Sequence, residues 1–114
     1  MIDIENMTYD TAIDFLNLKR NSTALNNRKQ FILGYLWALS EQHYLRIDKM
    51  VNYSILNQIE CVHEELKERV EDIEEHSDPY DKDEHRFKIE LLSSIDRLER
   101  FTVRIAKRIV TCGC

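Results

Sequence analysis

The sequence IDKMVNYSILNQIECVHEELKERVEDIEEH spans residues 47–76, and PYDKDEHRFKIELLSSIDRLERFTVRIAKRIV spans residues 79–110. Apolar residues recur in both stretches at steps of three and four, which is the period of an amphipathic helix. In the first stretch they are Ile47, Val51, Ile55, Ile59, Val62, Leu66, Val70 and Ile73. In the second they are Phe87, Leu91, Ile95, Leu98, Phe101 or Thr102, Ile105 and Ile109. We therefore predict two long helices, from about residue 47 to 76 and from about residue 79 to 110.

The link between these two stretches is very short. Ser77, Asp78 and Pro79 interrupt the pattern. Asp78 is a good N-cap, and Pro79 suits the first helical position because its missing N–H has no partner there. Helices joined by so short a link must fold back on each other. The sequence thus predicts a long antiparallel hairpin with arms of about 45 Å, at 1.5 Å of rise per residue.

Two shorter helices are predicted upstream of the hairpin. The first runs from about Thr8 to Lys19, is capped by Thr8 or Asp10, and follows a loose N-terminal arm. Residues 21–23, Asn-Ser-Thr, are typical of a loop. The fold class is therefore all-α, with four helices dominated by the hairpin of the third and fourth.

The second helix is predicted to start near Asn27, because Asn27 and Gln30 resemble a capping box. Nearly every residue from 31 to 39 is apolar, which is typical of a helix wrapped by its neighbours. We therefore expect Trp37 to be buried between this helix and the hairpin. Gly34 indicates either close approach of another backbone or a tolerated glycine. A turn is predicted near residues 44–46, with a continuous helix as the alternative.

Composition supports one helical domain over residues 1–114. Two glycines and one proline are too few for the many tight turns of a β-rich fold. The longest apolar run, residues 31–39, is too short to span a bilayer. The start of the chain lacks the pattern of a signal peptide. Cys61, Cys112 and Cys114 do not form a disulfide framework, which favours a reducing compartment, most simply the cytoplasm.

Charge is unevenly distributed along the hairpin. The formal net charge is −5; residues 60–84 hold twelve acids and three bases, whereas residues 85–114 hold seven bases and three acids. The basic end carries a row spaced three and four apart, and such spacing places side chains on one helix face. This row is Arg97, Arg100, Arg104 and Lys107, and the acids chosen at the tip are Glu68, Glu71 and Glu75. We interpret both sets as partner-binding residues; solvated helix faces are the alternative.

Catalytic and cofactor motifs are not recognisable in the sequence. It has no glycine-rich phosphate loop, nucleophile elbow or Cys-x-x-Cys pair. Cys61 has acidic neighbours, which would raise the pKa of its thiol. The hairpin turn would bring together two Asp–His pairs four residues apart, which makes a metal site at the tip an alternative. These pairs are Asp72 with His76 and Asp81 with His85. We expect no enzyme activity, cofactor or metal.

The function predicted from these features is a non-enzymatic protein-interaction module, such as a small regulator, inhibitor, antitoxin or immunity-type protein. A nucleic-acid accessory role through the basic row is the alternative, although a net negative charge disfavours it. A homodimer is expected, because apolar residues fall around more than one face of the last helix and one seam cannot bury them all. They are Phe87, Ile89, Leu92, Phe101 and Val103.

Overall fold

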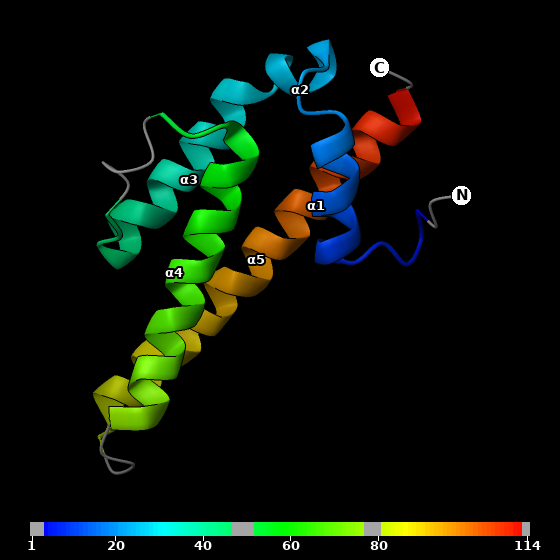
Figure 1. Cartoon of the computed structure of the whole chain (residues 1–114). Coiled ribbons are helices and arrows are strands. Elements are labelled where there is room, and N and C mark those ends of the chain that lie inside the picture. The colour runs from blue at the N-terminus through cyan, green and yellow to red at the C-terminus, as the bar shows by residue number, and fades with distance from the viewer. Residues whose placement is uncertain (1–3, 47–51, 77–80, 113–114) are drawn as a thin grey trace.

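The computed structural model describes residues 4–46, 52–76 and 81–112. In this part of the chain it contains five helices and no strand (Figure 1). They are α1 (Tyr9–Leu18), α2 (Thr23–Asn27), α3 (Lys29–His43), α4 (Ile55–His76) and α5 (Lys82–Cys112). The all-α fold is confirmed, and the short α2 adds one helix to the four expected.

The antiparallel hairpin of α4 and α5 is confirmed and forms the long axis of the molecule (Figure 1). The predicted stripe of α4 supplies Ile59, Val62 and Leu66, which are completely buried. From α5, Leu91 and Leu98 are equally buried. The three-and-four spacing therefore identifies the packed faces of both helices, except that Phe87 of the predicted stripe is exposed; Ile47 and Val51 lie outside the described residues.

Both hairpin helices begin later than predicted. Helix α4 begins at Ile55, where the Ser54 Oγ accepts the Asn57 N–H at 3.2 Å. Helix α5 begins at Lys82, where the Asp81 carboxylate accepts the N–H groups of residues 83 and 84 at 3.0 and 3.2 Å. In each case a polar side chain satisfies backbone donors that lack helical partners. The expected cap at Asp78 and the expected start at Pro79 lie outside the described residues.

The caps of the shorter helices are partly as predicted. Thr8 caps α1, and its Oγ1 accepts the Thr11 N–H at 3.2 Å. The capping box expected at Asn27 is wrong, because Asn27 is the last residue of α2. Ser22 caps α2, whereas Arg28 precedes α3 without a capping hydrogen bond from its side chain. The expected loop at residues 21–23 is confirmed apart from Thr23, with which the short α2 begins.

Helix α3 ends where a turn was predicted. Tyr44 adopts the left-handed conformation, with φ 53° and ψ 43°, which excludes the continuous helix. The Arg69 guanidinium of α4 donates hydrogen bonds to the carbonyl oxygens of His43 and Tyr44, at this helix end. Gly34 is exposed, and a Cβ built there would meet nothing within 4 Å. It is therefore a tolerated glycine and not a site of close approach.

The predicted burial of Trp37 is wrong. Its side chain is 56% exposed, and its Nε1–H donates a hydrogen bond to the Glu41 Oε1 at 2.9 Å. The buried face of α3 instead presents Ile32, Leu36 and Leu39. Helix α3 lies at the margin of the fold and packs mainly against α4, so only one of its sides is covered. An apolar residue on the other side has no neighbour to bury it.

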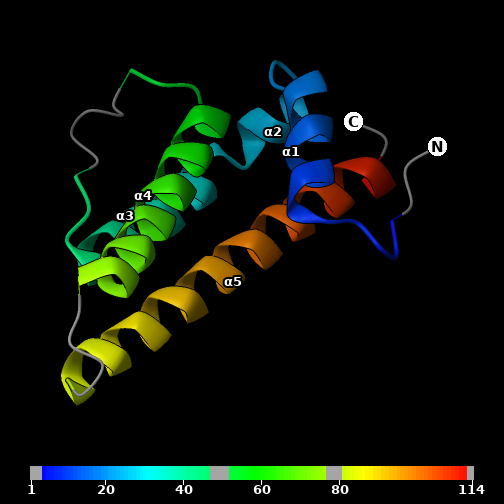
Figure 2. The same cartoon turned by 60° about the horizontal axis from the view of Figure 1, so that its bottom comes forward.

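The helices form a flat, elongated arrangement of 51 × 32 × 17 Å. Helix α1 packs along the C-terminal half of α5, and α3 packs on α4. Figure 2 shows α1, α3 and α4 on the same side of α5, which leaves the opposite side of α5 uncovered. Within the described residues, no helix combines the length and the apolar character needed to cross a bilayer.

Candidate functional site

The uncovered side of α5 carries the basic row predicted from the sequence. We call Arg97, Arg100, Arg104 and Lys107 the basic stripe. The three arginines are exposed, and Lys107 is half-buried. Arg100 forms an ion pair with Asp96, one helical turn away. In the described parts of the chain the other three cations form no ion pair. The stripe therefore presents positive charge to solvent along about three turns of helix.

A groove of about 740 Å³ runs between the N-terminal segment and the C-terminal half of α5. Three members of the basic stripe line it, together with Arg108. Its apolar wall comes from Ile4, Met7 and Val103. Met7 is buried, so the end of the segment before α1 packs on the fold, whereas the first three residues of the expected loose arm lie outside the described residues. The sequence does not predict this wall, because an isolated Met in a polar arm gives no periodic signal.

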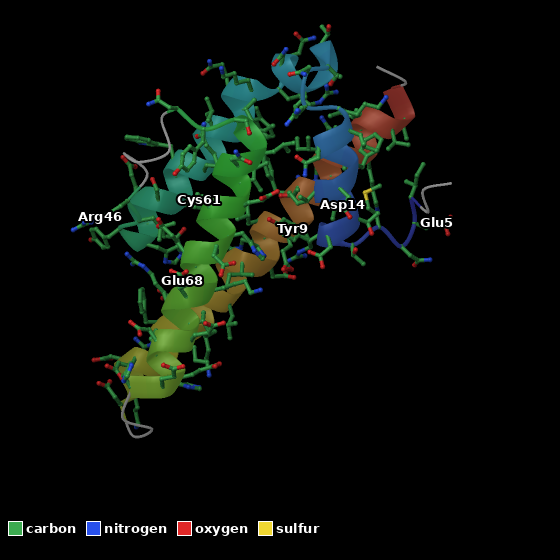
Figure 3. The ribbon with its side chains drawn as sticks, viewed as in Figure 1. Glu5, Tyr9, Asp14, Arg46, Cys61 and Glu68 are labelled. Carbon is green, nitrogen blue, oxygen red and sulfur yellow. The ribbon has the colours of Figure 1, made fainter. Side chains whose placement is uncertain are left out.

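The inner end of the groove contains Tyr9 and Glu99, with His63 beneath them. Figure 3 shows Tyr9 at the start of α1, beside α5. Its ring stacks on His63, with centroids 4.2 Å apart, and the His63 Nε2 lies 3.0 Å from the Glu99 Oε1. Burial, aided by nearby carboxylates, raises the pKa of Tyr9. Its buried hydroxyl therefore stays protonated, and it has no hydrogen-bond partner among the described residues.

An aromatic cluster borders the stripe on the α3 side. Tyr35 stacks on Phe101 with centroids 4.2 Å apart, and Phe31 lies 5.4 Å from the same ring. Phe31 is 63% exposed. Burial raises the pKa of Tyr35, and the arginines of the stripe oppose this rise, which places them near the cluster. The two aromatic residues of α3, four apart, are recognisable in the sequence, but the apolar segment around them predicts a core position and not a surface cluster.

The acidic site residues lie on a different face from the basic ones. Glu68, Glu71 and Glu75, with Glu64, are exposed along α4, and we call these four the acidic row. They share the side of α4 turned away from its buried stripe, hence away from α5. Figure 3 labels Glu68 on this helix. The structure therefore separates the two predicted sets onto opposite sides of the hairpin.

A buried serine–histidine pair joins α3 to α5. The His43 Nε2 lies 2.7 Å from the Ser94 Oγ, and both residues are about 1% exposed. Burial, with the nearby Arg69 guanidinium, lowers the pKa of His43, and Glu90 opposes this effect. A nucleophile and base need access for substrate and a group that orients the base. Here the His43 Nδ1 lacks a partner in the described structure, so the pair is a packing contact.

The proposed metal ligands do not form a cluster in the structure. The His76 Nε2 lies 3.9 Å from Asp72 and 3.7 Å from Glu75, and all three side chains are highly exposed. Among the described residues, no group of three or more His, Cys, Asp or Glu is placed to hold a metal ion. Cys61 is a free, half-buried cysteine, and burial with nearby glutamates raises the pKa of its thiol. This environment disfavours the reactive thiolate.

Comparison with known proteins adds no functional assignment. No family model matches the chain, and neither a curated protein nor a solved structure matches it significantly.

Proposed function

We propose that this protein is a non-enzymatic protein-interaction module that binds an acidic protein surface through the uncovered side of α5. The observation that supports this proposal most directly is the basic stripe beside the groove. Its cations are displayed along one side of a rigid 31-residue helix. The adjoining wall of Ile4, Met7 and Val103 offers apolar contact. Charge complementarity with apolar anchoring is the combination that protein interfaces use.

The exposed apolar residues of α5 extend this surface toward the hairpin tip. Ile89 is 54% and Leu92 is 46% exposed. Of the five residues expected to need a partner, Phe101 is buried and Val103 is half-buried, so the fold covers part of the set. Phe87, 37% exposed, lies instead toward the His43 ring of α3, and Ile89 and Leu92 stay accessible on the outer side of α5. A partner that covers them would gain apolar burial at about 25 cal/mol per Å².

Paired charge-reversal variants test the proposal. Arg100→Glu with Arg104→Glu would abolish capture of an acidic partner from a lysate of the native host. The matched control, Lys19→Glu with Lys29→Glu, makes the same charge change at exposed positions away from the stripe and would retain capture. Loss of the partner from both variants would show a general charge effect. Equal capture by both would exclude the stripe as the binding surface.

Nucleic-acid binding is a second candidate, and the aromatic cluster favours it. Exposed aromatic rings beside arginines can stack with bases while the cations neutralise phosphates. If nucleic acid binds here, Arg97→Glu, Arg100→Glu and Arg104→Glu together would abolish binding of a labelled single-stranded RNA or DNA. The affinity of the wild-type protein would fall steeply with added salt. Retained binding by the triple variant would exclude this surface.

The proposed biological role is that of a small regulator, inhibitor, antitoxin or immunity-type protein, which acts by occupying a surface of its partner. We place it in the cytoplasm, because the free Cys61 thiol suits a reducing compartment. We also propose that the chain self-associates, and the exposed Ile89 and Leu92 on α5 would add apolar contact to such an interface. Sedimentation under reducing conditions tests self-association without cross-links through Cys112 or Cys114.

A further inference from the structure

The acidic row and the basic stripe match each other in spacing as well as in charge. The row Glu64, Glu68, Glu71 and Glu75 has steps of four, three and four residues, whereas the stripe has steps of three, four and three. At 1.5 Å per residue the row spans about 16 Å and the stripe about 15 Å. The row is exposed throughout, as is the stripe apart from the half-buried Lys107, and they lie on opposite sides of one hairpin. One molecule therefore cannot join them, but two can.

We infer that the acidic row of one copy docks on the basic stripe of a second copy, head to tail. When α4 of one copy runs antiparallel to α5 of the other, Glu75 lies opposite Arg97 and Glu64 lies opposite Lys107. The row and the stripe then form four ion pairs between the two molecules. This inference rests on the proposed function, since it names a second copy of this chain as an acidic partner of the α5 surface. It also gives the acidic row a role in binding.

The placement of the two faces decides the symmetry of the contact. In a two-fold dimer both copies use the same patch, so a dimer through the α5 surfaces would leave the acidic row unused. A row-to-stripe contact joins different patches and leaves one free row and one free stripe at the ends of each pair. Such heterologous contacts continue into rings or open chains. In this inference a head-to-tail assembly takes the place of the closed homodimer expected from the sequence.

The contact between the two copies depends on exposed charges, and this determines how its strength varies with salt. Each exposed ion pair is weak by itself and is screened by salt. Association is therefore concentration dependent, strongest at low ionic strength and lost at high ionic strength. The Asp96 carboxylate, which pairs with Arg100 within the chain, competes for one cation and weakens the contact further.

Two variants remove the two faces separately. Glu68→Lys with Glu71→Lys removes the row, and Arg100→Glu with Arg104→Glu removes the stripe. All four residues are exposed, so both variants keep the fold, which circular dichroism and thermal unfolding check. The matched controls are Asp14→Lys with Glu90→Lys, and Lys19→Glu with Lys29→Glu, also at exposed positions. Sedimentation velocity in reducing buffer at low ionic strength measures the mass.

The wild-type protein and both controls should exceed twice the 13.7 kDa monomer mass as concentration rises. Each face variant alone should stay monomeric. In an equimolar mixture of the two face variants the intact row meets the intact stripe, and the reversed row and the reversed stripe also carry opposite charges, so the mixture should associate again. A monomeric wild type, a self-associating face variant or a monomeric mixture would overturn the inference. The capture experiment tests the proposed binding of an external acidic partner independently of this result.

Discussion

At the scale of single residues, Trp37 shows how apolar composition differs from burial. It lies in the most apolar segment of the chain, yet its indole is 56% exposed and hydrogen-bonded to Glu41. Its neighbour Leu36 is 3% exposed, because it faces α4 instead of solvent. A segment that is apolar on every side does not reveal which side the fold will cover.

The two neighbours should therefore respond differently to truncation. Trp37→Ala should change the free energy of unfolding by less than about 1 kcal/mol, as for other surface substitutions. Leu36→Ala should lower it by about 2–5 kcal/mol, because a buried cavity is created. Urea unfolding followed by circular dichroism measures both. Tryptophan fluorescence of the native protein should peak near the wavelength of indole in water, and a blue-shifted peak would contradict the exposed placement.

His43 should make stability depend on pH. Burial lowers the pKa of His43 in the folded state, so the unfolded chain, with a pKa of about 6.5, takes up the proton first as pH falls. The free energy of unfolding should thus decrease below pH ~6.5, by at most about 1.4 kcal/mol per pH unit, until the lowered folded pKa is reached.

Urea unfolding between pH 7.5 and pH 5 tests this expectation. His43→Gln keeps a hydrogen-bonding partner for Ser94 but does not titrate, so it should flatten the pH dependence in this window. His85→Gln, at an exposed position, is the control and should leave the dependence as in the wild type. An unchanged slope in the His43 variant would show that its proton uptake is not linked to unfolding.

At the scale of elements, the hairpin seam should tolerate no charge. Leu66 on α4 is completely buried, whereas the adjacent Lys67 is exposed. Leu66→Asp would bury an unpaired carboxylate and should lower the free energy of unfolding by several kcal/mol. Lys67→Asp should change it by about 0.5 kcal/mol or less. Similar thermal midpoints for the two variants would mean that the register of α4 against α5 is wrong.

The sequence predicted the helices and their buried faces well, but it predicted poorly where each helix begins. Apolar spacing identifies a stripe, as for Leu66 and Leu98, because any helix must bury its apolar side. A helix end depends on which of several polar residues caps the backbone. Ser54 and Asp81 cap α4 and α5, although Asp78 was an equally good candidate in the sequence. The short α2 was missed because five residues are too few for a periodic pattern.

Only the part of the candidate site that lies on a single helix was predicted from the sequence. Spacing alone placed the basic stripe on one face of α5. The groove required the N-terminal segment, and its inner end required Tyr9, His63 and Glu99, which are far apart in the sequence. The separation of the acidic row from the stripe depends on which sides of α4 and α5 pack together. Contacts across such distances leave no local pattern.

At the scale of the whole molecule, packing is uneven along the hairpin. The middle of α5 contacts several helices, since Glu99 meets α4 and α1 packs nearby, while Phe101 meets α3. Near the tip, residues 82–90 are exposed or half-buried, and Val70 is the last buried residue of α4. An ion pair between Lys88 and Glu74, 3.1 Å long, joins the two arms there. Covered and uncovered parts of the same helix should therefore differ in local stability.

Native-state hydrogen exchange should resolve this gradient. Amides of residues 83–90 and 71–76 should exchange at least about 100-fold faster than those of residues 98–106, because opening the tip exposes little apolar surface. Lys88→Gln should speed exchange only at the tip, and only slightly, since an ion pair that is partly exposed contributes little. Leu98→Ala should speed exchange along the whole of α5, because this residue belongs to the shared core. Uniform protection from tip to core would mean that a further surface, such as a second copy, covers the tip in solution.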